Sequence, residues 1–123
     1  MELSELFKEN FILWAKKRQP FNYNKYTKKL TCFGKSFFEL PLAFQLNAFA
    51  VFLDESDVCV CIEPYLGGGT PAYFACVKYR NENHIDMQRD VYNGSEYEFW
   101  TRHEATIAAL GEAIRIYESK HPF

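Results

Sequence analysis

The sequence has no apolar run of the roughly 20 residues needed to cross a bilayer. Its longest apolar stretch, from Leu40 to Leu53, is interrupted by Pro41, Gln45 and Asn47, and we predict a buried helix there instead. The first five residues, MELSE, are acidic where a secretory signal would be basic. These absences predict a cytoplasmic protein.

Catalytic motifs are missing as well. The chain has no nucleophile elbow, no HExxH pattern and no paired-cysteine signature. His84 and Asp86 can be combined on paper into a general acid-base pair, but their spacing gives no sign of partners that would set orientation and pKa. We therefore predict no enzymatic activity, and a small enzyme around His84 and Asp86 is only a third hypothesis.

Cysteine is scarce, and in a reducing compartment its thiols stay free. Cys59 and Cys61 alternate inside a β-branched run, whereas zinc ligands usually stand in knuckle-forming turns. We predict that these residues, with Cys32 and Cys76, are small core or half-buried thiols. The prediction includes no metal and no other cofactor, and leaves open whether Cys76 shares a strand face with Cys59 and Cys61.

The glycine triplet at 67–69 does not predict a phosphate-binding loop. Such loops lead from a strand into a helix whose N–H groups meet the anion. Here the glycines lead through Thr70 and Pro71 into another strand-like run. The triplet therefore predicts a hairpin tip that needs positive φ angles.

Apolar and aromatic residues are plentiful. Of 123 residues, 48% are hydrophobic and 18% aromatic, which is enough for one core without staples. No linker, repeat or low-complexity segment divides the chain. We predict a single domain over residues 1–123.

The first half of the chain predicts two helices. An apolar stripe follows Ser4, a plausible N-cap, and should end near Arg18 ahead of Pro20. Residues 21–36 fit neither the helical nor the strand period and are predicted to be loop with short extended pieces. A second helix starts at Pro41 and runs to about Asp54; it is apolar on nearly every side, so we expect cover on more than one face.

The second half predicts strands and a final helix. The runs at 58–62 and 72–77 predict an antiparallel hairpin, residues 81–95 an exposed loop, and residues 97–100 a third strand. Thr101 and Glu104 form a capping box that starts the last helix, which should end near Lys120. The predicted fold is α+β: two N-terminal helices, a three-stranded antiparallel sheet and a C-terminal helix, with the helices packed on one sheet face around residues 42–53.

Charge is distributed unevenly, because the segment 16–35 contains seven basic residues and no acidic one. Aromatic side chains are interleaved with them, which suits phosphate neutralisation and base stacking. A chain divided in this way can also satisfy its charges internally, with a second copy of itself, or with an acidic protein. The basic patch consists of Lys16, Lys17, Arg18, Lys25, Lys28, Lys29 and Lys35.

The aromatic excess indicates an interface, since 22 aromatic side chains exceed what a core of this size hides completely. Peripheral packing under the loops is an alternative. The candidate partner-binding residues are Tyr65, Tyr92, Tyr97 and Trp100.

Two segments carry a resemblance to known proteins. These are FFELPLAFQL, which ends at Leu46, and WTRHEATIAAL, which begins at Trp100. The pattern is similar to small uncharacterised proteins of bacteriophages and prophages. This resemblance implies an accessory protein in the cytoplasm of a bacterial host, where it would bind and block a host factor, but it assigns no functional residue.

The leading hypothesis is therefore a non-enzymatic protein-binding module. The second is a nucleic-acid-binding accessory protein that uses the basic segment 16–35. A protein partner is expected, nucleic acid and a homo-oligomer are open alternatives, and no membrane is involved.

Overall fold

The computed structural model describes residues 3–120. Within this range the chain forms two compact units, which meet in sequence between Phe52 and Leu53 near the end of one helix. None of the described helices is long and apolar enough to span a membrane. The secondary structure is α+β, as predicted, whereas the single-domain organisation stays a prediction.

The N-terminal unit begins with helix α1 (Glu5–Ala15), which starts where predicted. The hydroxyl of Ser4 accepts a hydrogen bond from the backbone N–H of Phe7 at 3.1 Å, as an N-cap should. The helix ends three residues before the predicted stop at Arg18, and Lys16 forms its C-cap.

The segment predicted to be loop with short extended pieces forms a small antiparallel sheet, so the prediction of a single sheet is wrong. Its strands are β1 (Phe21–Asn24), β2 (Lys29–Cys32) and β3 (Lys35–Ser36), in that order across the sheet. The strands have only four, four and two residues, which is too short for a period of two to stand out. Residues Phe21, Tyr23, Leu30 and Cys32 lie on one face.

Aromatic rings fill the core of the N-terminal unit. Phe11 is fully buried, and its ring lies 5.0 Å from that of Phe49 and 5.1 Å from that of Phe37, centroid to centroid. It also contacts Trp14 and Phe21. Most of these pairs are tilted or edge-on, the geometry in which aromatic quadrupoles attract.

A short helix η1 (Phe37–Glu39) precedes α2 (Leu42–Asp54), and α2 ends where predicted. Cover on more than one face was expected for α2, and part of its apolar surface nevertheless stays uncovered, because Phe44 and Val51 remain 37% and 43% exposed. Gln45, one of its polar residues, is half-buried and donates from Nε2 to the carbonyl oxygens of Phe38 and Leu40. The Gln45 amide therefore provides a hydrogen-bond donor for two backbone carbonyl oxygens at the start of α2.

The C-terminal unit is an antiparallel sheet with the order β4-β5-β6, followed by α3. The predicted hairpin is confirmed and is longer than expected, with β4 spanning Val58–Tyr65 and β5 spanning Ala72–Arg80. The turn between them contains the glycine triplet, and Gly69 adopts the positive φ of 84° that a hairpin tip requires.

The predicted position of the third strand is wrong. Strand β6 is Asp86–Val91, inside the segment expected to be an exposed loop. Its sequence, DMQRDV, is polar because most of it is solvent-exposed at the edge of the sheet. The segment predicted as strand contributes only an isolated bridge, in which Phe99 and Tyr73 exchange two backbone hydrogen bonds of 2.8 Å.

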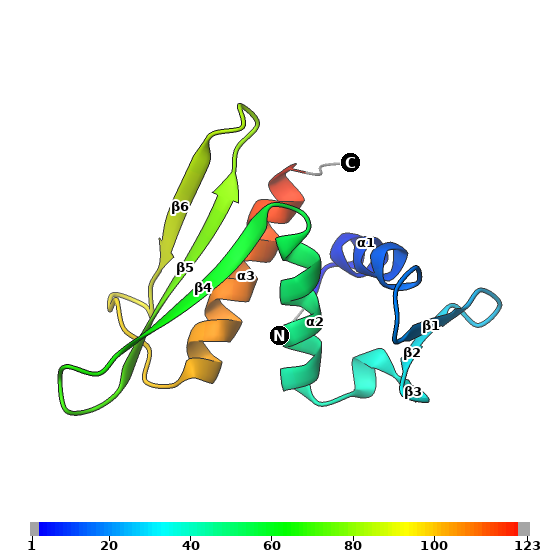
Figure 1. Ribbon diagram of the computed structural model, residues 1–123, viewed down its shortest axis with the longest axis horizontal. Coiled ribbons are helices and arrows are strands. Elements are labelled where there is room, and N and C mark those ends of the chain that lie inside the picture. The colour runs from blue at the N-terminus through cyan, green and yellow to red at the C-terminus, as the bar shows by residue number, and fades with distance from the viewer. Residues whose placement is uncertain (1–2, 121–123) are drawn as a thin grey trace. The chain divides into compact units, whose positions relative to one another are not determined.

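Helix α3 (Arg102–Lys120) lies along one face of this sheet (Figure 1). Small side chains allow a close approach, since Ala75, Ala105 and Ala109 form one buried cluster with Phe99. Glu112 adds polar contacts, because its carboxylate pairs with Arg89 of β6 and with Arg115 of its own helix.

Thr101 caps α3 as predicted, since its hydroxyl accepts from the N–H of Glu104 at 3.1 Å. Among residues 3–120, the reciprocal bond of the capping box does not form. The helix extends to Lys120, the last residue that the structure describes, so its predicted end near Lys120 stays a prediction. Packing of α1 and α2 on a sheet face also stays a prediction.

Candidate functional site

The two faces of the β4-β5-β6 sheet differ in character. Val60, Ile62, Tyr73 and Val91 pack toward α3. Because side chains alternate along a strand, the register places the neighbouring residues on the opposite face. We call this second surface the open face; it carries Cys59, Cys61, Glu63, Tyr65, Phe74, Cys76, Lys78, Arg80, Asp86, Gln88 and Asp90.

Three free thiols share the open face, which answers the question that the sequence left open. Cys61 and Cys76 are directly opposite each other on β4 and β5, and Cys59 lies two residues along β4. All three are half-buried, as predicted. Within residues 3–120, no group of three or more His, Cys, Asp or Glu side chains is placed to hold a metal ion.

Four aromatic rings form a continuous row at one end of the open face. Tyr65 lies 5.8 Å from Phe74, Phe74 lies 5.1 Å from Tyr97, and Tyr97 lies 5.1 Å from Tyr92, between ring centroids. The three tyrosines are 40–56% exposed. We call these four residues the aromatic row.

The aromatic row includes three of the four candidates that the sequence indicated. The fourth, Trp100, is 56% exposed but makes no ring contact with the row among the described residues. Phe74 was missed, although it precedes Cys76 by two positions in a strand-like run and so had to share its face. The alternation of side chains along a strand could therefore have identified Phe74, but only after the face occupied by Cys76 was known.

A small depression of about 120 Å³ lies beside the row, lined by Tyr97, Phe74, Cys61, Cys76 and Asp90 among others. The Asp90 carboxylate is the main reason that the pKa of Tyr97 is raised, because it favours the protonated phenol. Tyr97 follows β6 in the chain, and its ring packs against Phe74 of the open face and against Tyr92.

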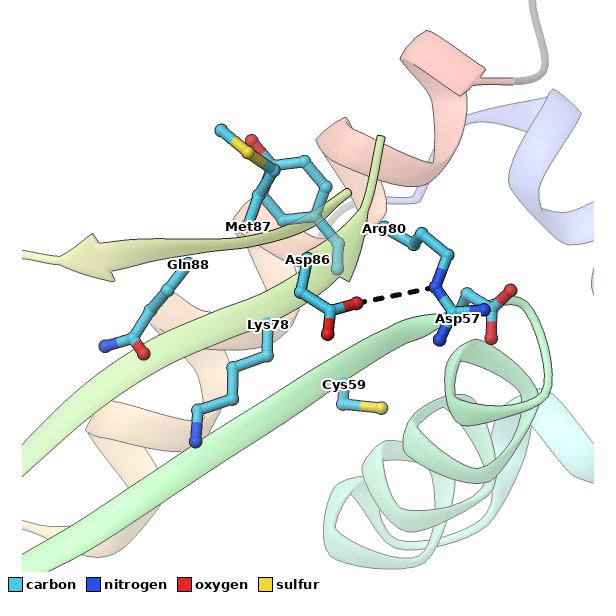
Figure 2. A pocket seen from close by; sticks show the side chains of 8 residues that line it. Asp57, Cys59, Lys78, Arg80, Asp86, Met87 and Gln88 are labelled. Carbon is cyan, nitrogen blue, oxygen red and sulfur yellow. Dashed lines mark hydrogen bonds and ion pairs between the residues drawn. The ribbon is translucent and has the colours of Figure 1, made fainter. Parts of the chain in front are cut away.

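A second, wider depression of about 410 Å³ lies at the other end of the sheet. Figure 2 shows its side chains, including Cys59 and Lys78 on neighbouring strands. Asp86 is already paired with Arg80, at 3.4 Å between Oδ1 and Nε. Its carboxylate is therefore engaged in an exposed ion pair.

The hypothetical acid-base pair does not assemble in the described structure. His84 lies in the turn before β6, with a φ of 60°, and makes no hydrogen bond with Asp86 among residues 3–120. Neither His84 nor His103 lines either of these two depressions. His103 is exposed in the first turn of α3.

The basic patch lies in the N-terminal unit, on and around the β1-β2 hairpin. Arg18 is not free, because its guanidinium stacks over the Trp14 ring at 4.6 Å and donates to the Trp14 carbonyl oxygen. The other six members are exposed lysines. None of these six forms an ion pair within the part of the chain that the structure describes.

The thiol of Cys76 should react slowly with alkylating reagents. Burial raises its pKa to about 11 from the ordinary 9.0, with further contributions from the adjacent Cys61 thiol. Since only the thiolate is nucleophilic, we expect iodoacetamide to modify Cys76 at pH 8 roughly 100-fold more slowly than an exposed cysteine. Peptide-resolved mass spectrometry after timed alkylation between pH 7 and pH 11 measures this rate.

Cys61→Ala is the matched variant, because it removes the neighbour but leaves most of the burial. Cys61→Ala should raise the alkylation rate of Cys76, but not to the rate of an exposed cysteine.

The raised pKa of Cys76 also makes stability depend on pH. Above pH 9 the folded state retains a proton that the unfolded chain releases, so this thiol stabilises the fold below its unfolded pKa. That contribution should fall as the pH rises from about 9 toward 11. Equal rates in native and urea-unfolded protein would contradict the assignment.

Comparison with known proteins adds no family. No family model, no curated protein and no solved structure matches the chain.

Proposed function

We propose that this protein is a non-enzymatic binding module that holds a short segment of a partner protein on the open face of the β4-β5-β6 sheet. The observation that carries the proposal is the aromatic row, whose three tyrosines are partly exposed and are linked ring to ring through Phe74. Rings held by neighbouring rings lose little conformational freedom on binding, and aromatic side chains are enriched among the residues that dominate binding energy.

The size of the open face supports a short segment as the ligand. Its strands have eight, nine and six residues, so the face measures roughly 27 by 14 Å, or about 400 Å². A stable interface between two globular proteins buries about 800 Å² on each partner. The footprint of the open face is small on this scale, which suits a peptide better than a second copy of the chain.

The chemistry of the face also suits a peptide. Tyrosine hydroxyls can donate to peptide carbonyls while their rings cover aliphatic side chains. Glu63 and Asp90 add acceptors near the row, and Lys78 adds a cation in the middle of the face. A peptide segment with apolar residues and at least one charged group would match both the aromatic row and the charged side chains of the open face.

The resemblance to bacteriophage and prophage proteins extends the proposal. Such a protein would act by occupying a segment of a host factor and blocking its normal contacts. Support for this step rests on the two segments that carry the resemblance, FFELPLAFQL and WTRHEATIAAL. Support for the binding surface rests on the aromatic row. The two parts can therefore fail separately.

Site-specific photo-crosslinking tests the binding surface. A benzophenone amino acid replaces Phe74 within the aromatic row, and in a control replaces Ile85, which is 56% exposed in a turn of the same unit. Ultraviolet irradiation of cells that express the full chain should give a discrete adduct at position 74 and none at position 85. Tyr65→Ser combined with Tyr97→Ser should reduce the adduct at least thirtyfold, as expected for hot-spot residues worth 2 kcal/mol or more.

The mass of the adduct identifies the class of partner. An adduct of twice the mass of the chain would replace the peptide partner by a second copy. Identical adduct patterns at positions 74 and 85, or no adduct at position 74, would overturn the proposal.

A further inference from the structure

The β1-β2 hairpin of the N-terminal unit presents a second surface that the proposed function does not use. Its register pairs Asn22 with Thr31 and Asn24 with Lys29 on one side of the hairpin. On the other side, Leu30 and Cys32 are buried. The hairpin is therefore anchored by its apolar side and presents amides, a hydroxyl and an ammonium group outward.

The hairpin and its flanks carry unbalanced positive charge. Residues 16–35 contain no acidic side chain, and the six exposed lysines of the basic patch have no ion-pair partner among residues 3–120. In the same unit, the ion pair between Lys8 and Glu5 shows that lysine outside this segment does find a carboxylate. Repulsion among the lysines is a cost of this arrangement that an anionic ligand would relieve.

Exposed rings accompany these cations. Tyr26 at the hairpin tip is 85% exposed, and Phe33 in the turn between β2 and β3 is 71% exposed. The ammonium of Lys25 lies 5.3 Å from the centroid of Tyr26, and that of Lys16 lies 5.7 Å from Tyr23. Each contact places positive charge and a flat ring next to each other, as a nucleotide requires.

The hairpin is also hollowed, and residues from both of its faces line the hollow. A shallow depression of about 710 Å³ is formed by the hairpin alone. Its lining combines cations, tyrosine rings and uncharged hydrogen-bonding groups, namely Asn22, Tyr23, Asn24, Lys25, Tyr26, Thr27, Lys29 and Thr31.

We propose that the β1-β2 hairpin is a binding site for single-stranded nucleic acid, in which the lysines neutralise phosphates and Tyr26 stacks on an unpaired base. Asn22 and Thr31 are placed to hydrogen-bond base edges or sugars from the same side. This site lies in a different unit from the aromatic row and is independent of the proposed peptide site.

The exposed rings distinguish this ligand from other polyanions. In duplex DNA or RNA the bases are already stacked, so a tyrosine at a hairpin tip gains nothing from them. An acidic protein segment would engage the lysines but leave Tyr26 without a matching partner. Single strands offer both phosphate charge and free base faces.

Fluorescence anisotropy with a labelled oligothymidylate of about twelve nucleotides tests the proposal. The full-length protein should bind at low salt, and the logarithm of the association constant should fall with the logarithm of salt by about 0.7 for each phosphate contact. Lys25→Gln or Lys29→Gln should each lower that slope by about 0.7. Tyr26→Ser should weaken binding roughly five- to 150-fold and leave the slope unchanged.

Arg115→Gln is the matched control, because Arg115 is an exposed cation on α3 of the other unit, outside the open face, and its loss should have no effect on binding. All four substitutions are at exposed positions, and circular dichroism verifies that each variant is folded. No binding at low salt would overturn the proposal. It would also fail if Arg115→Gln weakened binding as much as Lys29→Gln, or if a duplex or a polyglutamate peptide bound more tightly than the single strand.

Discussion

Phe11→Ala is expected to lower the free energy of unfolding by about 3–5 kcal/mol. Phe11 has no exposed surface and contacts a ring on almost every side, including Trp14, Phe37 and Phe49. Truncation removes the buried area and leaves a cavity that neighbouring rings can fill only in part. Urea titration followed by the fluorescence of Trp14, in a Trp100→Phe background, reports directly on this unit.

Phe33→Ala provides the control for Phe11→Ala. It removes the same ring from the same unit, but at a position that is 71% exposed, so its effect should stay within about 0.5 kcal/mol. If both substitutions destabilised the protein equally, the aromatic core assigned to the N-terminal unit would be wrong.

Phe99→Ala should have a comparable effect in the C-terminal unit, about 3–5 kcal/mol. Phe99 is 4% exposed and fills the space among Ala75, Ala105 and Ala109. The side chains of these alanines are too short to fill the cavity that the substitution leaves. Urea unfolding followed by far-ultraviolet circular dichroism measures the loss, and the adjacent but 56% exposed Trp100 supplies the control as Trp100→Ala.

The two phenylalanine variants together test the single-domain prediction. If residues 3–120 unfold as one cooperative structure, both variants shift one common transition. If the two units unfold independently, Phe11→Ala shifts only the Trp14 signal, and Phe99→Ala leaves that signal unchanged.

Local signals in the sequence located the helices and the central hairpin well. Ser4 and Thr101 each cap a helix through the hydrogen bond that their position predicted, because capping depends on only a few neighbouring residues. The glycine triplet likewise marked the turn between β4 and β5. The aromatic candidates Tyr65, Tyr92, Tyr97 and Trp100 are all exposed, and their role in partner binding stays a prediction.

Features that depend on pairing between segments were not predictable. Strand β6 is polar, and only its register with β5 shows that it belongs to a sheet. The short strands β1 to β3 form a sheet because the turns at Lys28 and Phe33, with φ values of 57° and 55°, bring them together. The aromatic row required the knowledge that Tyr97 folds back to Asp90 on β6.

The crowding of lysines on the β1-β2 hairpin has a practical consequence for handling the protein. Seven of the protein's fourteen basic residues lie within the twenty positions 16–35, although the chain as a whole has a net charge of −2. At 0.1 M salt, electrostatic interactions extend only about 10 Å. A negatively charged resin or glass surface is therefore attracted by the local positive charge of the hairpin, whatever the net charge of the protein. Purification schemes chosen from the overall charge alone would therefore misjudge where this molecule adsorbs.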